Sequence, residues 1–237
     1  YGESSSLLSN LTTSEAFFLI IIIAVVGMVV QMRLRTVFNK YSNVGLSNGM
    51  PGAEIAATML RDHNIHNVRI TQVDGELTDH YNPATKTIAL SEEVYASRSI
   101  AAAAVAAHEC GHALQHAHEY APLKMRSALV PAVNFASKWV TWILLGGILL
   151  IETNPRLLLL GVILYGITTL FSFITLPVEI NASARAISWL SRTGITDGRT
   201  QPMAIDALKW AAYTYVIAAL GSLATLLYYI GLARSRD

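Results

Sequence analysis

The stretch HECGHALQHAH, residues 108–118, places four histidines and a glutamate within eleven residues and begins with the pattern His-Glu-x-x-His. Residues four apart on an α-helix lie about 6 Å apart along nearly the same face, so His108 and His112 can reach one zinc ion. Glu109 lies beside the same cleft and can take a proton from a zinc-activated water and later pass one to a leaving amine. The stretch therefore predicts one zinc ion per chain, held by His108 and His112, with Glu109 as the catalytic acid and base.

Catalytic zinc takes three protein ligands and a water, so one ligand is missing from this pair. His118 would complete the metzincin spacing HExxHxxGxxH. However, Gln115 stands where that pattern has the glycine that lets the chain turn back, and Gln115 favours continued helix. In a straight helix His118 lies about 9 Å beyond His112 on another face. We expect His116, His118 and Glu119 to form the solvated end of the helix, and His118 stays open as an alternative ligand.

Glu179, in the stretch LPVEINASARA (176–186), is the other choice for the third ligand. It follows a strongly apolar segment, and a carboxylate near a membrane is costly unless something pairs with it, as zinc would. The alternative is that Glu179 only stabilises a helix N-terminus, because Pro177 is well placed to begin a new helix.

The composition points to a membrane protein. The chain has 237 residues, of which 53% are hydrophobic and only 14% charged, whereas soluble domains carry about 25% charged residues. Four apolar segments are long enough to cross a bilayer: residues 16–32, 129–151, 157–176 and 210–232. The second segment contains Lys138, which either reaches the membrane interface or indicates a helix that packs against protein.

The lysines and arginines near the segment ends predict the orientation, because cytoplasmic loops carry an excess of them. They place residues 33–128 and 177–209 in the cytoplasm and the N-terminus outside. Residues 1–15 contain no lysine or arginine, and no small-residue cleavage site follows the first apolar run, so we expect that segment to be retained. The net charge of +1 argues against a nucleic-acid partner. Cys110 falls on the reducing side, and we expect it to be buried and inert.

Residues 33–128 are polar enough to fold as a small α+β domain. Its patterns predict a helix opened by Pro51, a strand over 68–73, a hairpin of 77–81 and 86–90, a helix start at 91–93, and a long helix from Ser99 to about Glu119.

Three stretches carry a resemblance to a known family: LTDHYNPATKTIALSEEVY (77–95), RSIAAAAVAAHECGHALQH (98–116) and LPVEINASARA (176–186). Together they resemble the YugP-like family of neutral zinc metallopeptidases of bacterial membranes, which are gluzincins with HExxH and a later glutamate. The resemblance implies that Glu179 is the third zinc ligand, that Glu109 is the acid and base, and that the protein lies in the bacterial cell membrane. The fold class expected is an α-helical membrane protein of about four transmembrane helices with an inserted cytoplasmic α+β gluzincin-like zinc peptidase domain.

The chain is also similar, more distantly, to the CAAX-prenyl-type and heat-shock membrane endopeptidases, whose third ligand stands in an E-x-x-A-D stretch. There the aspartate supports a zinc-binding histidine, but this chain has Ser183 in its place, so either Ser183 or Asn181 would have to replace it. The same analogy puts residues 79–82 on a substrate-binding edge strand, where His80 could help polarise the scissile carbonyl. A solvent-exposed strand residue is the equal alternative for His80.

These inferences predict a membrane-integral zinc endopeptidase that hydrolyses protein or peptide substrates at the cytoplasmic face of the lipid bilayer. The alternatives are an intramembrane protease and a non-proteolytic zinc-binding scaffold. The expected parts are an N-terminal segment with the first span, the zinc peptidase domain, the second and third spans, a helix with the third ligand, and the last span (residues 1–32, 33–128, 129–176, 177–209 and 210–237).

Overall fold

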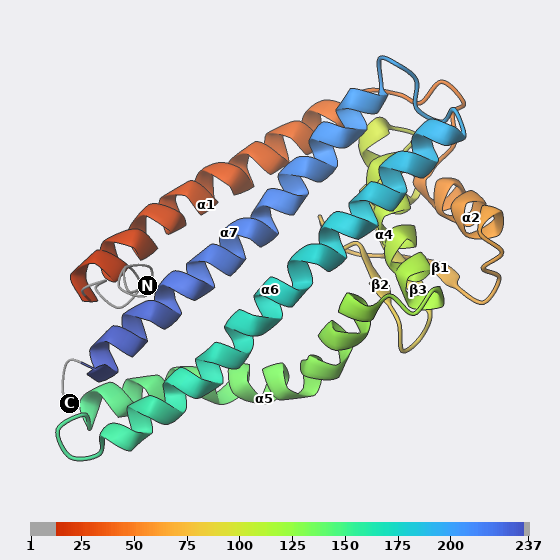
Figure 1. Cartoon of the computed structure of the whole chain (residues 1–237). Helices are drawn as coiled ribbons and strands as arrows, with labels where there is room; N and C mark the ends of the chain where they lie inside the picture. The colour runs from red at the N-terminus through yellow and green to blue at the C-terminus, as the bar shows by residue number, and fades with distance from the viewer. Residues whose placement is uncertain (1–12, 235–237) are drawn as a thin grey trace, which may run out of the picture. The chain divides into compact units, whose positions relative to one another are not determined.

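The computed structural model describes residues 13–234 and is mostly helical, with one small sheet (Figure 1). Residues 1–12 of the expected N-terminal segment and residues 235–237 of the expected C-terminal segment lie outside this range. The described elements, in chain order, are α1 (Thr13–Ser42), α2 (Gly52–Asp62), β1 (Arg69–Val73), β2 (His80–Asn82), β3 (Thr87–Ser91), α3 (Glu92–Tyr95), α4 (Ile100–Ala117), α5 (Ala121–Leu149), α6 (Pro155–Arg192) and α7 (Gln201–Arg234).

Four helices in residues 13–234 are long and apolar enough to cross a membrane: α1, α5, α6 and α7. Helices α1, α6 and α7 each contain one of the four apolar segments, and α5 covers residues 129–149 of the segment expected over 129–151, which confirms four spans by length and composition. Helices α1, α6 and α7 extend beyond their apolar segments because further residues continue the helical backbone at their ends, whereas α5 ends two residues before its segment does. In α5, Val140 and Leu144 are buried, whereas Trp139, Trp142 and Leu145 have exposed side chains, so the described residues leave one apolar face of this helix uncovered.

Pro177 does not begin a new helix, as the sequence suggested, but lies inside α6. A proline in a helix loses one hydrogen bond, the one its own N–H would donate to the carbonyl four residues back. The residues that follow it bury Ala186, Trp189 and Leu190 in the core, and this packing keeps the chain helical. The apolar span and the segment with Glu179 are therefore one continuous helix.

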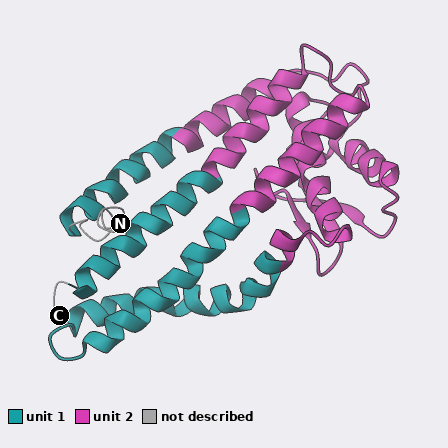
Figure 2. Cartoon of the chain, in the orientation of Figure 1, with its two compact units in different colours: residues 1–29, 125–175, 215–237 teal, residues 30–124, 176–214 magenta. Residues whose placement is uncertain are grey.

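The chain divides into two compact units (Figure 2). Unit 1 comprises residues 1–29, 125–175 and 215–237. Within it, the backbones of α5 and α6 approach closely: a Cβ on Gly147 would lie 2.6 Å from the Cα of Leu158. The hydroxyls of Thr169 and Ser222 share a 2.7 Å hydrogen bond between α6 and α7. Small residues at close contacts and polar cross-links of this kind are typical of helices packed in membranes.

Unit 2 comprises residues 30–124 and 176–214, so it joins two segments that the sequence separates by about fifty residues. Its sheet has the order β1-β3-β2, with β1 parallel and β2 antiparallel to β3. The expected hairpin is thus confirmed, with β2 confined to His80–Asn82. One face of the sheet packs on the same core as α4, through Ile70, Tyr81, Ile88 and Leu90.

The helices of unit 2 begin where the sequence signals place them. Pro51 is the N-cap of α2, and the Ser99 side chain accepts a hydrogen bond from the Ala102 N–H at the start of α4. A Cβ on Gly52 would lie 2.1 Å from the Val94 carbonyl oxygen, so only glycine allows α2 to lie this close to α3. The long helix ends at Ala117, slightly before the expected Glu119.

Candidate metal centre

The two histidines of the motif lie side by side on α4. Their ring centroids are 4.8 Å apart, and the rings meet edge to face at 85°. This follows from their spacing of four residues, which puts both side chains on one helical face. The α4 helix is continuous from Ile100 to Ala117, so its backbone holds the two rings rigidly toward the same point.

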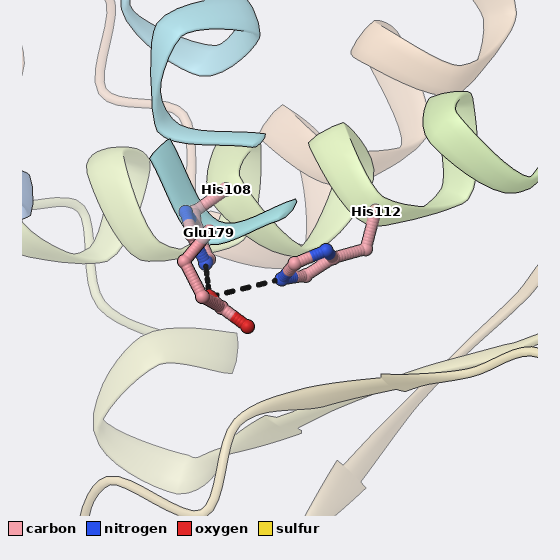
Figure 3. Close-up of side chains that lie close together, drawn as sticks. All are labelled: His108, His112 and Glu179. Atoms are coloured by element: carbon pink, nitrogen blue, oxygen red, sulfur yellow. Dashed lines mark ion pairs between the residues drawn. The ribbon is translucent and has the colours of Figure 1, made fainter. Parts of the chain in front are cut away.

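Glu179 of α6 points at both rings (Figure 3). Its Oε2 atom lies 3.3 Å from Nε2 of His108 and 3.4 Å from Nε2 of His112, and the three ligand atoms all lie within 4.8 Å of one another. Two zinc ligands at the usual bond lengths and a tetrahedral angle are about 3.3–3.5 Å apart. The two histidine–glutamate distances therefore fit a shared zinc ion.

The charges of this group also fit a cation. Glu179 is only 2% exposed, and a buried carboxylate needs a positive partner. Burial by itself lowers the pKa of His112, but the hydrogen bond to Glu179 and the charges of Glu109 and Glu179 outweigh burial and raise that pKa above its ordinary value. The surroundings thus favour a positive charge between the rings and the carboxylate, whether carried by a proton or by a metal ion.

A close contact between backbones brings α6 to the motif. A Cβ built on Gly111 would lie 2.5 Å from the carbonyl oxygen of Ala182 and 3.0 Å from its Cα. Both residues are buried, and Ala182 is one helical turn from Glu179. The glycine inside HECGH therefore lets α6 lie against α4 closely enough for its glutamate to meet the two histidines.

Each histidine has a polar partner at its other ring nitrogen. Nδ1 of His108 lies 3.0 Å from Oγ of Ser183, and Nδ1 of His112 lies 3.0 Å from Oε1 of Gln115. Such partners orient the ring, and a partner that accepts from Nδ1 holds the proton there, which leaves Nε2 free to bind metal. Of the two residues considered for supporting a zinc-binding histidine, Ser183 contacts His108, while Asn181 contacts Gln115 and Arg185 instead.

Gly111, Ala182 and Gln115 were not recognised from the sequence as parts of the site. A signal for the first two was present: the run of small residues before the motif and the alanines at 182 and 186 mark faces on which helices approach closely. Nothing in the sequence could mark Gln115, because its role depends on the carbonyl and amide of a helix more than sixty residues away.

Glu109 is 6% exposed and belongs to the buried part of α4. Its charge acts on His112 and helps to raise the pKa of that ring. A carboxylate beside the candidate ligands and almost enclosed by protein is suited to receive and return a proton.

His118 is not brought to the metal centre. It is the C-cap of α4, and its Nδ1 lies 3.4 Å from Nη1 of Arg185. The helix runs through Gln115 without the turn that a metzincin ligand needs. His116 contacts the Tyr81 hydroxyl at 2.8 Å, and Glu119 pairs with Lys124 at 3.0 Å, so the end of the motif helix has other contacts.

His80 lies in β2 with an exposed side chain. Its Nδ1 donates a hydrogen bond of 2.8 Å to the Thr78 carbonyl oxygen, which can only accept. Side chains alternate between the faces of a strand, and the neighbouring Tyr81 occupies the face that contacts α4. His80 therefore lies on the opposite face of β2 from Tyr81, and its catalytic role stays a prediction.

Cys110 is a buried free cysteine whose Sγ lies 3.5 Å from the Ala56 carbonyl oxygen. Burial and the nearby charge of Glu109 raise the pKa of its thiol well above the usual value. A thiol in this state is a poor nucleophile, which agrees with the inert structural role expected from the sequence.

Comparison with known proteins points in the same direction as the geometry. Residues 16–234 match the family described as "Putative neutral zinc metallopeptidase". The chain is 42% identical over 215 residues to a protein of Bacillus subtilis (strain 168) named "Putative membrane protease YugP", an alignment that covers 90% of this chain and 95% of that protein. No solved structure matches the chain significantly.

Proposed function

The chain belongs to the family described as "Putative neutral zinc metallopeptidase", and from this premise we propose that it is a membrane-integral zinc endopeptidase. The single observation that carries the proposal is the position of Glu179. Its Oε2 lies 3.3 and 3.4 Å from the Nε2 atoms of the two motif histidines. Two histidines and a carboxylate, all buried or nearly buried, are the donor set of catalytic zinc sites in which water takes the fourth position.

In the proposed reaction His108, His112 and Glu179 hold zinc, and Glu109 moves the proton. Zinc in such a site lowers the pKa of its bound water toward about 7 and polarises the peptide carbonyl. Glu109 takes a proton from the attacking water and gives one to the leaving amine. The apolar residues around the motif, among them Ala106, Ala107 and Ala113, keep bulk water away and strengthen these charge interactions.

We infer that the peptide substrate binds beside β2. This strand is at the end of the sheet order, and its outer edge has no strand partner within residues 13–234. An extended peptide can add to such an edge through backbone hydrogen bonds. The Tyr81 hydroxyl of β2 contacts the His116 ring of α4, so β2 lies beside the motif helix. This contact supports placing the peptide near the proposed metal.

We propose that this site works at the cytoplasmic surface of the bilayer rather than within it. The expected third span ends at Leu176, three residues before Glu179, and α4 is not among the four helices of the described chain that could cross a membrane. The orientation rests on the lysine and arginine excess in 33–128 and 177–209. An intramembrane protease would instead carry its motif within a span.

The proposal is tested with Glu109→Gln in the full-length protein in detergent micelles. We expect one zinc ion per chain to be retained and the hydrolysis of an unfolded protein to fall about 100- to 10,000-fold, the usual contribution of a general acid and base. Glu119→Gln is the matched control, because that exposed glutamate lies just beyond α4 and pairs only with Lys124 in the contacts above. Normal turnover by Glu109→Gln would refute the mechanism, and zinc without hydrolysis in the wild type would favour a scaffold.

His80→Ala tests the remaining catalytic assignment. A loss of kcat at unchanged zinc content would support a role for His80 in polarising the carbonyl. His66→Ala is the control, since it removes another exposed histidine of unit 2. An unchanged kcat in His80→Ala would leave His80 as an exposed strand residue.

A further inference from the structure

Gln115 is a fully buried polar residue one helical turn beyond His112. Its side chain makes three hydrogen bonds: Oε1 to Nδ1 of His112 at 3.0 Å, Nε2 to the Val178 carbonyl at 2.7 Å, and Nε2 to Oδ1 of Asn181 at 3.0 Å. The last two partners flank Glu179 on α6. One amide thus connects a proposed zinc ligand of α4 with the backbone that carries the third ligand.

The direction of these hydrogen bonds follows from the partners. The Val178 carbonyl can only accept, so the Gln115 amide group faces α6 and its oxygen faces His112. Oδ1 of Asn181 also accepts from Nε of Arg185 at 2.8 Å, and a guanidinium can only donate. Arg185 therefore holds the Asn181 amide in the orientation that receives the Gln115 donor.

These hydrogen bonds determine which nitrogen of the His112 ring carries the proton. Because an oxygen of Gln115 faces Nδ1, that nitrogen must carry the proton and donate it. In the neutral ring the lone pair is then on Nε2, the atom that lies 3.4 Å from Glu179. This is the tautomer that a metal ligand requires.

We propose that Gln115 is a positioning residue that holds His112 in its metal-binding tautomer, and that α6 in turn holds Gln115. This inference rests on the proposed zinc site. The two histidines are then held differently: Nδ1 of His108 contacts Ser183 of α6 itself, whereas Nδ1 of His112 contacts Gln115, which in turn is held by α6. The site is thereby complete only when α6 is docked on α4, because the same helix supplies Glu179 and orients the amide.

Two substitutions at Gln115 separate positioning of the ring from mere attachment of α6. Gln115→Met has a similar length but offers no donor to α6 and only a weakly accepting thioether to the ring. Gln115→Glu keeps an oxygen that accepts from His112 but loses the amide donors to Val178 and Asn181. Both variants lose the link to α6, and only the methionine loses the oxygen acceptor for the ring.

The matched control is Gln201→Met in α7. Gln201 is also partly enclosed in unit 2 and donates from Nε2 to the Ile187 carbonyl at 3.1 Å. It contacts neither motif histidine in the hydrogen bonds of the described chain, so its replacement weakens packing around α6 without touching the metal centre.

The measurement is zinc affinity of the full-length protein in detergent micelles, by competition with a chromophoric chelator, together with thermal unfolding of the metal-free forms. We expect Gln115→Met to bind zinc at least about tenfold more weakly, the lower range for loss of such a partner. Gln115→Glu and Gln201→Met should stay within about threefold of the wild type, although all three unfold at lower temperature.

Equal loss of zinc affinity in the methionine and glutamate variants would overturn the positioning role and leave Gln115 as an attachment of α6. Unchanged affinity in Gln115→Met would overturn it as well, with the proposed function intact. A wild-type protein that binds no zinc would refute the proposed function itself and, with it, this inference.

Discussion

Gly111 of α4 and Ala182 of α6 are in backbone contact: a Cβ on the glycine would lie 2.5 Å from the alanine carbonyl oxygen. This contact decides whether Glu179 can reach the histidines. It joins a residue of the metal motif to a helix that follows two long apolar segments in the sequence.

Gly111→Ala should therefore disrupt the site even though alanine is the better helix former. Real Cβ atoms do not approach a carbonyl oxygen this closely, so α6 must move away, at a cost of about 1–3 kcal/mol for overpacking. We expect a lower unfolding temperature and weaker zinc binding, measured by thermal unfolding and metal titration.

Gly166→Ala provides the control for helix propensity, because a Cβ there would meet nothing within 4 Å. It should leave zinc binding unchanged. Wild-type zinc affinity in Gly111→Ala would show that the contact does not set the position of Glu179.

Glu179→Ala should lose stoichiometric zinc, because two histidines alone leave a catalytic zinc site one protein ligand short. Elemental analysis of the purified protein measures this directly. His118→Ala should keep its zinc, since His118 lies at the C-cap of α4 beside Arg185. The reverse pattern would restore His118 as the third ligand.

Ser183→Ala should weaken zinc binding about 10- to 100-fold, because the His108 ring loses the partner at Nδ1 that orients it. Ser172→Ala is a matched control on the same helix, where the hydroxyl donates to the Thr168 carbonyl within α6. Similar zinc affinities in the two variants would count against a supporting role for Ser183.

The stabilising effect of zinc should grow as the pH rises from about 6 to about 8. In the metal-free protein the raised pKa of His112 stabilises the fold below the unfolded value of 6.5, and this contribution is lost as the pH rises through the folded pKa. Zinc needs the neutral ring, so proton and metal compete. Unfolding temperatures with zinc and with chelator, compared across this range, measure the difference.

The same comparison in Glu179→Ala serves as the control, because that variant should show little effect of zinc at any pH. A zinc effect in the wild type that shrinks with rising pH would contradict the assignment of His112 as a ligand.

Much of the fold follows from local patterns. The four apolar segments appear as helices because a bilayer-length run of apolar residues has few alternatives. Pro51 and Ser99 stand at the starts of α2 and α4, where their backbone and side-chain preferences act within one turn. The sequence was misleading at Pro177, because a local helix-start signal was outweighed by the packing of the residues that follow it.

Within the candidate metal centre, the relative positions of His108, Glu109 and His112 follow from the sequence once this stretch is helical. Their spacing on a helix fixes their relative positions whatever the rest of the chain does.

Glu179 and Ser183 are candidates already in the sequence and the family resemblance, but their contacts with the histidines, like that of Gln115, arise only in the tertiary structure. Glu179 and Ser183 contact the motif because Gly111 allows the backbones of α4 and α6 to lie against each other. Acceptors on α6 orient the Gln115 amide. A zinc site needs ligands arranged around a point, and a single straight helix offers them only along a line. The third ligand therefore has to come from a second helix, and no local pattern in the motif specifies which helix that is.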